Sequence, residues 1–463
     1  MTLRNQAMDI DRLNFWQRIR YSIFPGTFQG VLDRERYRQL FNGLLLHFRP
    51  LTVPRRTLRF SLTWGLGGMA LVLVTMLFAT GLMLKFVYQP VPDRAYDSIV
   101  HLQNTVYFGQ LIRNIHHWSA NLLLLVVLLH FLRVFFSGAF HPPRQFNWVI
   151  GLTMFLLLLG SNFTGYLLPW DQLAFWAVTI CTGMLEYIPV IGLGLQKLVR
   201  GGPDIGSATL SIFFAIHTAI IPAGLIILMP FHFWRIRKAK GLVIPREPDE
   251  ELSGRGESVA TIPNLIVREL VVAAFLVALV AMISVMANAP LEAEANPGLS
   301  PNPTKAPWYF AGLQELLLHF HPLVAVLVIP VIVVGLLFLL PYLGYEADTA
   351  GVWFASHRGR KTAVIAAAAA LILTPPWIIA DEFGIDLAAR MPAIPPVISN
   401  GLVPVTIILA GVIGFYWWTK KKYDATNNEA VQAVFVLLLT AFVILTITCV
   451  WFRGAEMKLV WPW

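Results

Sequence analysis

Nine long apolar segments run through the chain of 463 residues and limit the folds that it can adopt. They cover about residues 62–88, 108–137, 146–167, 210–234, 264–287, 322–342, 361–380, 401–419 and 430–452. Each contains about 20 residues or more, the length that an α-helix needs to cross a hydrocarbon core about 30 Å thick. Only 13% of the residues are charged, against roughly 25% in soluble domains. The sequence therefore predicts an all-α, polytopic transmembrane helical bundle.

The positions of the basic residues predict the orientation of the bundle. Eleven arginines precede the first apolar segment. If that end is cytoplasmic, the loops on its side hold twelve Lys and Arg residues, and the loops on the opposite side hold five. This excess favours a cytoplasmic N-terminus, and an odd number of spans then leaves the C-terminus outside. Membrane orientation accounts for the net charge of +9, so no nucleic-acid partner is expected.

Composition divides the chain into five regions. We expect a cytoplasmic N-terminal segment (1–61), a four-span domain (62–245), a cytoplasmic linker (246–262), a three-span domain (263–380) and two extra C-terminal spans (381–463). Two stretches of the first region, "MDIDRLNFWQRIRYSIF" and "VLDRERYRQLFNGLLLHF", mix arginines with aromatic and leucine residues. This mixture is typical of amphipathic helices that lie on a membrane surface.

Four histidines lie inside two of the apolar segments. His130 follows His116 by fourteen positions, and His232 follows His217 by fifteen. On an α-helix, fourteen steps fall about 40° short of four turns, and fifteen steps go about 60° beyond them. The two histidines of each helix therefore share one broad face and are roughly 21–23 Å apart along the helix axis. Both segments run from outside to inside. His116 and His217 should therefore share the outer depth, and His130 and His232 the inner depth.

Two facing imidazoles at each depth favour one kind of ligand. Neutral imidazole binds zinc, copper or iron, but a zinc site normally has three or four protein ligands. No cysteine or carboxylate lies beside the histidines in the sequence. Haem iron held on both axial faces needs only two. We therefore predict two haems, although a single histidine in a span is often only a hydrogen-bonded contact between helices.

Glycines in the neighbouring spans repeat at a similar spacing. Gly81 follows Gly67 by fourteen positions in the first span, and Gly165 follows Gly151 by fourteen in the third. A flat cofactor edge can approach a helix closely where a side chain is missing, although glycine is also common in membrane helices generally. The four glycines are therefore predicted to adjoin the haems.

Two arginines flank the histidines of the second span. Arg113 precedes His116 by three positions, and Arg133 follows His130 by three. Either guanidinium could form charge-assisted hydrogen bonds with a haem propionate. Arg133 could equally extend to the membrane surface as an anchor.

With these residues in place, the chain resembles the cytochrome b subunit of the Rieske/cytochrome b complexes, the quinol:cytochrome c and quinol:plastocyanin oxidoreductases. The resemblance rests on "RNIHHWSA", "HTAIIP", "HFWRIRK", "GYLLPWDQLAFWAV" and "PNPTKAPWYFAGLQELL", and it covers about residues 60–345. It is similar to the chloroplast-like branch, in which a four-span cytochrome and a three-span second subunit are separate chains. Here the two would be fused, with the join near 246–262.

The resemblance implies a function and a set of partners. The family oxidises quinol at the outer surface and passes electrons through two b-type haems to a quinone at the inner surface, coupled to proton translocation. The outer haem would be held by His116 and His217, and the inner haem by His130 and His232. The expected partners are a Rieske-type iron–sulfur protein, a c-type cytochrome subunit and the quinone pool. The complex is expected to be a homodimer in the inner membrane of a bacterium.

The resemblance also implies residues of the quinone sites. Trp308 and Tyr309 would line the outer quinol pocket, beside the "LPWDQ" loop. Arg237 matches an arginine near the family's inner quinone site. The cysteine that carries an additional covalent haem in some chloroplast-like members has no counterpart, because no cysteine precedes Cys181.

The sequence departs from the family at the outer quinol motif, normally Pro-Glu-Trp-Tyr. Pro307 stands at the position of the glutamate, and Ala306 at that of the proline. Another group must then accept the proton. Glu315, seven positions after the tryptophan and on about the same helical face, is the first candidate, with Asp171 and His319 as alternatives.

Two other functions are compatible with intramembrane histidines. A dihaem membrane anchor of a dehydrogenase would also exchange electrons with quinone, but it would not need the "APWYF" segment or the second half of the chain. A transporter could use histidine and arginine as a proton relay, but its preparation would be colourless. The last two spans match neither branch of the family, and a contact with a partner subunit is our expectation for them.

Overall fold

The computed structural model describes residues 14–23, 52–59, 65–248, 250, 256–346, 348–384, 390 and 392–461. Within these residues, nine helices are long and apolar enough to cross a membrane. They are α4 (Leu66–Lys85), α6 (Gly109–Phe136), α7 (Gln145–Leu167), α10 to α11 (Ser207–Lys238), α12 (Thr261–Met286), η5 to η6 (Val324–Tyr342), α15 (His357–Phe383), η7 to α17 (Ile398–Tyr423) and α18 (Asn427–Trp451). The predicted all-α bundle of nine spans is confirmed, and the chain is a multi-pass membrane protein.

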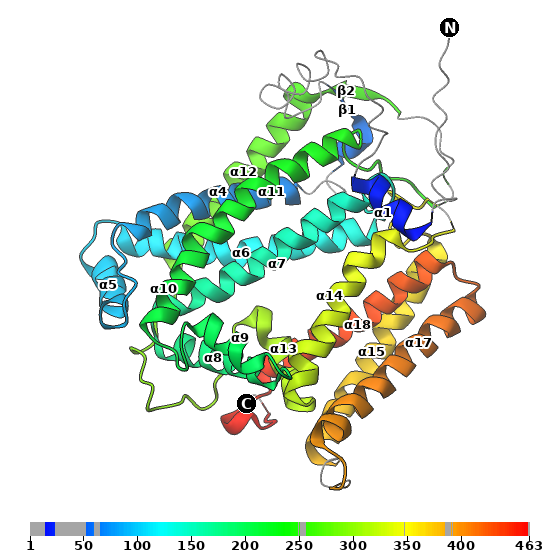
Figure 1. Cartoon of the computed structure of the whole chain (residues 1–463). Helices are drawn as coiled ribbons and strands as arrows, with labels where there is room; N and C mark the ends of the chain where they lie inside the picture. Colours follow the sequence, from blue (N-terminus) through cyan, green and yellow to red (C-terminus); the bar gives the residue numbers. More distant parts are fainter. Residues whose placement is uncertain are drawn as a thin grey trace.

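Several spans are composite, and shorter elements connect them. The composite spans contain α10 (Ser207–Ala215), η4 (Ile216–Ile220), α11 (Ile221–Lys238), η5 (Val324–Val328), α14 (Ile329–Leu339), η6 (Leu340–Tyr342), η7 (Ile398–Leu402) and α17 (Val403–Tyr423). The shorter elements are α1 (Phe15–Ile23), β1 (Thr52–Pro54), η2 (Arg55–Leu58), α5 (Pro92–Asn104), α8 (Gln172–Gly183), η3 (Met184–Tyr187), α9 (Gly192–Arg200), β2 (Ser258–Ala260), α13 (Trp308–His319) and η8 (Ala455–Met457). Figure 1 shows α5, α8, α9 and α13 at one end of the bundle, called the outer end below, and α1, β1 and β2 at the opposite, inner end.

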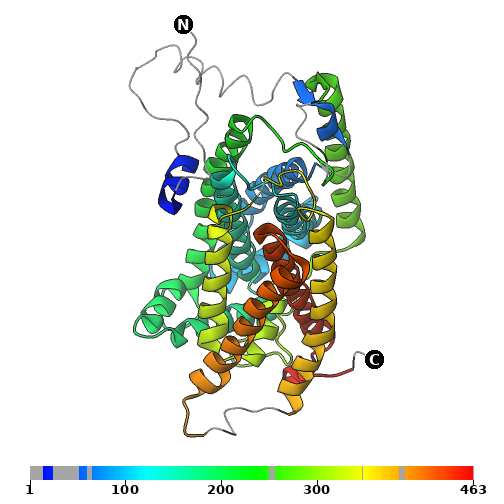
Figure 2. The same cartoon turned by 90° about the vertical axis from the view of Figure 1, so that its right-hand side faces the viewer.

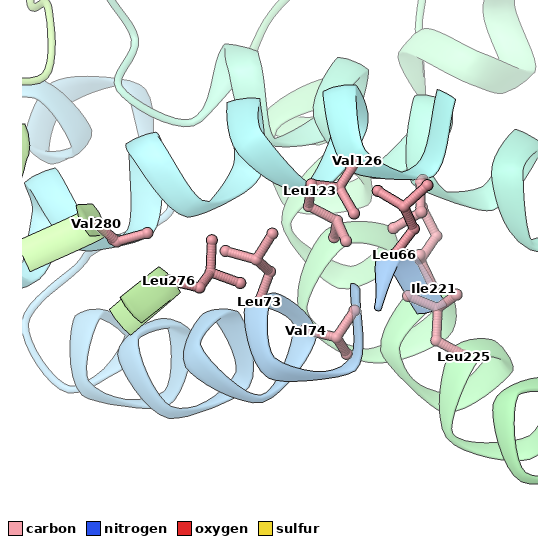
Figure 3. Packing of buried hydrophobic residues seen from close by; sticks show 10 residues of the cluster. Leu66, Leu73, Val74, Leu123, Val126, Ile221, Leu225, Leu276 and Val280 are labelled. Atoms are coloured by element: carbon pink, nitrogen blue, oxygen red, sulfur yellow. The ribbon is translucent and has the colours of Figure 1, made fainter. Parts of the chain in front are cut away.

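The first four spans form the core, and α12 covers one side of it. Helix α6 packs along α4 and α12, while α7 packs along α11. Buried aliphatic side chains join these helices in Figure 3, where Leu73 of α4 lies near Leu123 of α6 and Leu276 of α12. Because lipid tails are as apolar as these side chains, close packing holds the helices together here more than the hydrophobic effect does.

The second half of the chain forms a neighbouring group of helices, seen from the side in Figure 2. Helix α18 packs against α15, α17 and α13. Aromatic side chains at the inner end connect this group to the core, and the rings of Phe135 on α6 and Phe435 on α18 are 4.1 Å apart between centroids. The two halves therefore share a packed interface.

The inner end ties the N-terminal segment to the linker. Strand β1 pairs antiparallel with β2, and Arg56 forms a bidentate ion pair with Glu250, with 2.7 Å between Nη2 and Oε2. Helix α1 contacts α7 and η6. The first predicted surface helix thus corresponds to α1, and the second, about residues 31–48, lies outside the described residues.

In three of the described spans a proline follows a widened turn. The described spans contain three π-helical turns, at Ile216–Ile220, Val324–Val328 and Ile398–Leu402. Each turn ends two positions before a proline, namely Pro222, Pro330 and Pro404. Proline cannot donate the backbone hydrogen bond of an α-helix, so the turn before it opens to accept the interruption.

Candidate functional site

His116 of α6 and His217 of the η4 turn face each other near the outer end, with 6.2 Å between ring centroids. The Nδ1 atom of His217 donates to the carbonyl of Ser161 at 3.0 Å. The Nδ1 atom of His116 lies 2.9 Å from the hydroxyl of Thr80, which itself donates to the Met76 carbonyl at 2.7 Å. The hydroxyl must therefore accept from His116. Both rings carry their proton on Nδ1, which leaves the lone pair of each Nε2 for a metal.

A glycine lies against each ring of the outer pair. A β-carbon built on Gly81 would lie 3.2 Å from Cε1 of His116, and one built on Gly165 would lie 2.5 Å from Cε1 of His217. We expected these glycines to make room for the edge of a cofactor. The structure places them directly behind the imidazoles, so the missing side chains make room for the histidine rings.

In the inner pair a glycine again lies behind each ring, but Nδ1 of neither His130 nor His232 has a hydrogen-bond partner among the described residues. His130 and His232 lie close enough to interact electrostatically, and β-carbons built on Gly67 and Gly151 would lie 3.8 and 3.4 Å from their respective Cε1 atoms. Nδ1 of His130 and Nε of Arg133 are buried and have no hydrogen-bond partner among the described residues. Such groups are costly to bury unless a partner satisfies them.

The η4 turn explains how the two histidine pairs can match although their spacings along the sequence differ by one. His217 is the second residue of this π-helical turn, and such a turn takes in about one residue more than an α-helical turn. The longer spacing from His217 to His232 is thereby equivalent to the shorter spacing from His116 to His130 on a regular helix. On a uniform α-helix, His232 lies about 60° beyond His217 around the helix axis. With one residue taken up by the π-helical turn, the spacing corresponds to fourteen α-helical steps, about 40° short of four turns, as from His116 to His130.

The two pairs fit bis-histidine haem better than a smaller metal site. Among the described residues, no group of three or more His, Cys, Asp and Glu side chains is arranged to hold a metal ion, so a zinc site of the usual kind is not formed there. Two metal–imidazole bonds of about 2.0 Å would separate the ring centres by roughly 6 Å, close to the observed 6.2 Å. The unpartnered guanidinium nitrogen of Arg133 suits an anionic substituent.

Arg113 is occupied by a different contact. Its guanidinium donates to the carbonyls of Ala289 at 2.8 Å and Pro290 at 2.6 Å. Trp118, also on α6, donates from its indole nitrogen to the Ala287 carbonyl at 2.8 Å. The outer part of α6 therefore holds the segment that follows α12. Arg113 keeps further N–H groups, so this contact does not exclude the predicted propionate.

Asp171, in the "LPWDQ" loop, is engaged by the backbone. It begins α8 as its N-cap, accepting from the amide of Ala174 at 2.9 Å, and it also accepts from the amide of Glu292 at 3.3 Å. Gln172 donates from its backbone to the Ala293 carbonyl at 2.8 Å. Burial raises the pKa of Asp171, and the two amides act in the opposite direction. Asp171 thus fastens the loop to the segment after α12.

Trp308 and Tyr309 begin α13, close to the outer part of the core. Trp308 is 39% exposed and donates from its indole nitrogen to the side-chain oxygen of Asn121 on α6 at 2.8 Å. Tyr309 is partly buried, and burial raises its pKa. The next residue, Phe310, contacts Phe163 of α7 with 6.1 Å between ring centroids. The start of α13 is thereby placed against both α6 and α7. Asn121 lies five positions, less than two helical turns, after His116 on α6.

Glu315 is fully buried and forms a short ion pair. Its Oε1 lies 2.7 Å from Nη2 of Arg453, and its Oε2 lies 3.0 Å from Nε of the same guanidinium. Arg453 also binds Glu382 at 2.7 Å. On the other side, Nε2 of His319 lies 3.2 Å from Glu315, while Nδ1 lies 2.7 Å from Asp381.

Burial and pairing act in opposite directions in this outer charged cluster, defined as Glu315, His319, Asp381, Glu382 and Arg453. Burial by itself would raise the pKa of Glu315, but hydrogen bonds from His319 and Arg453 bring it below its usual value. Burial by itself would lower the pKa of His319, but its two carboxylate partners raise it. The two carboxylates therefore favour the charged form of His319, and His319 and Arg453 favour the charged form of Glu315.

Sequence reasoning found only part of this cluster. Glu315 and His319 were candidates, whereas Arg453, Asp381 and Glu382 were not. The signal available was their position, because all three lie at the outer ends of α15 and α18, where an unpaired charge would be costly. At the other end of the core, Arg237 lies in the last turn of α11, and its place at an inner quinone site stays a prediction.

The fold and these residues define a multi-pass helical membrane protein with two pairs of histidines inside a four-helix core. The family model described as "Cytochrome b/b6/petB" matches residues 54–240. Cytochrome b6 of Synechococcus elongatus is 43% identical over 173 residues, covering 37% of this chain and 80% of that protein. Cytochrome b6 of Prochlorococcus marinus is also 43% identical over 173 residues, covering 37% of this chain and 79% of its own.

The chain belongs to the cytochrome b/b6 family. The resemblance inferred from its motifs is confirmed, and membership implies that it binds b-type haem. A solved structure described as "Hyperthermophilic respiratory Complex III" matches with a TM-score of 0.58 and 21% identity, covering 90% of this chain and 96% of that chain. This likeness shows that the shared fold continues beyond the four-span domain.

Proposed function

We propose that the chain is the dihaem cytochrome b subunit of a membrane quinol oxidoreductase. It would oxidise quinol at the outer end and pass electrons to a quinone at the inner end, coupled to proton translocation. The observation that carries this proposal is the outer histidine pair. His116 and His217 face each other at 6.2 Å, and neighbouring groups hold both Nδ1 protons, so each ring presents a metal-binding nitrogen.

The haem ligands follow from the two depths. His116 and His217 would hold the outer haem, and His130 and His232 the inner one. The two haems would supply one-electron transfer across the membrane. Gly67, Gly81, Gly151 and Gly165 leave space for the ligand rings. Arg133, with its unpartnered nitrogen, would bind a propionate of the inner haem, and Arg113 one of the outer haem.

Trp308, Tyr309 and Glu315 would form the outer quinol site. The hydrogen bond from Trp308 to Asn121 holds the start of α13 against α6, and the tyrosine adds a phenol to the same turn. Glu315 would accept a quinol proton in place of the glutamate that Pro307 replaces. Asp171 is the alternative for that role, and its carboxylate accepts from two backbone amides.

The remaining assignments concern orientation and assembly. The inner end would be cytoplasmic, with Arg237 beside the inner quinone, and the C-terminal tail would lie outside. The domain limits given above would describe a four-span cytochrome fused to a three-span second subunit and two extra spans. A Rieske-type iron–sulfur protein, a c-type cytochrome and a second copy of the complex would be its partners in the inner membrane of a bacterium.

A reduced-minus-oxidised spectrum of the purified complex, combined with quinol-driven haem reduction, tests the proposal. We expect two b-type haems per chain that quinol reduces, and quinol oxidation that is sensitive to inhibitors of the outer site. Haem reduction without this sensitivity and without a copurifying iron–sulfur protein would favour a dehydrogenase anchor. A colourless preparation would exclude both of these functions.

A further inference from the structure

His319 connects a fully buried carboxylate with one that reaches the surface. Its Nε2 faces Oε1 of Glu315 at 3.2 Å, and its Nδ1 faces Oδ2 of Asp381 at 2.7 Å. The side chain of Glu315 is 0% exposed and that of His319 is 1% exposed, whereas that of Asp381 is 32% exposed. The imidazole therefore lies between a carboxylate without access to solvent and one with access.

The other charged contact of Glu315, with Arg453, offers no path for a proton. Arg453 binds Glu315 on one side and Glu382 on the other, and its own side chain is only 1% exposed. Because a guanidinium does not lose its proton in proteins, it cannot pass a proton onward. His319 is thus the only titratable neighbour through which Glu315 can exchange a proton with the surface, among the described residues that contact it.

The last span helps to position these groups, and the segment after it supplies Arg453. Arg453 follows α18, and that helix packs along α13. Lys305 donates to the Val450 carbonyl at 3.0 Å, and the thiol of Cys449 lies 3.5 Å from Oε1 of Gln314. One contact lies before the first residue of α13 and the other after it, and together they fasten α18 to α13. Besides the members of the cluster itself, the ionisable groups that face it from neighbouring elements are therefore Lys305 and Cys449.

We propose that His319 carries protons from Glu315 to Asp381 and so to the outer surface, and that Arg453 is a positioning residue that keeps Glu315 in place. This proposal rests on the proposed outer quinol site. A quinol hydroxyl proton moves to the carboxylate of Glu315. His319, as the neutral ring with its proton on Nδ1, takes the Glu315 proton at Nε2 and releases its Nδ1 proton to Asp381, which gives it to water. A flip of the ring then turns the bare nitrogen back toward Glu315 for the next proton. One proton is moved and no electron is transferred along this route.

The last two spans acquire a role on this account. With Pro307 in place of the usual glutamate, the proton acceptor lies about two helical turns further along α13. A buried carboxylate there needs a compensating cation and a route to water. The segment after α18 supplies the cation, and the end of α15 supplies the route.

Asp381→Asn tests the route with little risk to folding, because this side chain is partly exposed. Measured on the complex in membranes, quinol oxidation at pH 7 should fall about tenfold or more, as for the loss of a group that transfers protons. Asp381→Glu should restore most of the rate, because it restores the carboxylate. Equal rates in the wild type and Asp381→Asn across pH 5.5–9 would overturn the proposal.

His319→Gln and the matched control His321→Gln test the relay residue. His321 lies two positions further on, and its ring contacts Tyr187 rather than the cluster. We expect slowed quinol oxidation and a changed pH profile only in His319→Gln, with the haem spectrum unchanged in both variants. A wild-type pH profile in His319→Gln would refute the relay. A wild-type complex that does not oxidise quinol at all would instead refute the proposed function, so the two failures are distinguishable.

Discussion

Gly165 of α7 lies so close to His217 that a β-carbon at this position would come within 2.5 Å of the imidazole Cε1 atom and 2.9 Å of Nδ1. This is the tightest of the four contacts between glycine and histidine in the core. It occurs in the same stretch of α7 as Ser161, whose carbonyl accepts the Nδ1 proton of that ring. One turn of α7 therefore sets both the position and the tautomer of one proposed haem ligand.

Gly165→Ala should remove the outer haem. The added methyl group must push His217 away from its partner, because the helix backbone behind it cannot move easily. Gly160→Ala is the matched control on the same helix, since its β-carbon would lie at an ordinary 3.7 Å from Ile221. Haem content per chain distinguishes them: we expect about one haem in Gly165→Ala and two in Gly160→Ala. Two haems in both would show that the contact is not required.

Arg453→Met should destabilise the second half of the protein. Glu315 would remain buried without its cation, and the loss of one partner of a buried ion pair costs about 3–5 kcal/mol. Arg390→Met is the control, because this exposed arginine hydrogen-bonds only to the Gly384 carbonyl among the described residues, and its replacement should change stability by about 0.5 kcal/mol or less. Thermal unfolding of the purified complex measures both variants. Equal unfolding temperatures would contradict a structural role for the pair.

Trp308→Phe should weaken quinol binding while leaving the haems in place. The substitution keeps an aromatic ring but removes the hydrogen bond to Asn121, which is worth about 0.5–1.5 kcal/mol. KM for quinol should therefore rise about two- to tenfold. Trp176→Phe, which removes a comparable indole contact to the Asn296 carbonyl, should leave KM unchanged. A similar KM in all three proteins would place the quinol elsewhere.

Two substitutions of Asp171 distinguish a role as helix cap from a role in proton transfer. Asp171→Ala removes the cap of α8 and should destabilise the protein by about 0.5–2 kcal/mol. Asp171→Asn keeps an acceptor oxygen for the amides of Ala174 and Glu292 but cannot accept a proton at pH 7. If the residue only holds the loop, Asp171→Asn should retain the wild-type pH profile of quinol oxidation. A lost limb in that profile would make Asp171 the proton acceptor.

The sequence was sufficient to predict the spans, because each is a continuous apolar run with charged residues at its ends. The first span begins at Leu66, and it was predicted to begin at about residue 62. It was also sufficient to bring His116 and His217 to one depth, since depth depends only on position along a span. It did not predict the π-helical turn at His217, because that turn depends on how Pro222 is accommodated. It did not predict Arg453 beside Glu315 either, since a pairing between groups so distant in the sequence depends on tertiary packing.

The contact between Trp308 and Asn121 also depends on tertiary packing and was not predicted. Both residues were visible in the sequence, and the tryptophan was predicted to line a pocket. The identity of its partner depends on how the segment after α12 crosses the outer end, which Arg113 and Trp118 determine through backbone carbonyls. Local patterns carry no information about such contacts.

The central claim is that each haem is held by one histidine from α6 and one from the span formed by α10, η4 and α11. Haem content and redox titration of His217→Ala and His232→Ala measure it most directly. We predict one remaining haem in each variant, with a different midpoint potential in the two, because the lost haems lie at different depths. Two haems in either variant, or the loss of both haems from a chain that is still folded, would contradict this assignment.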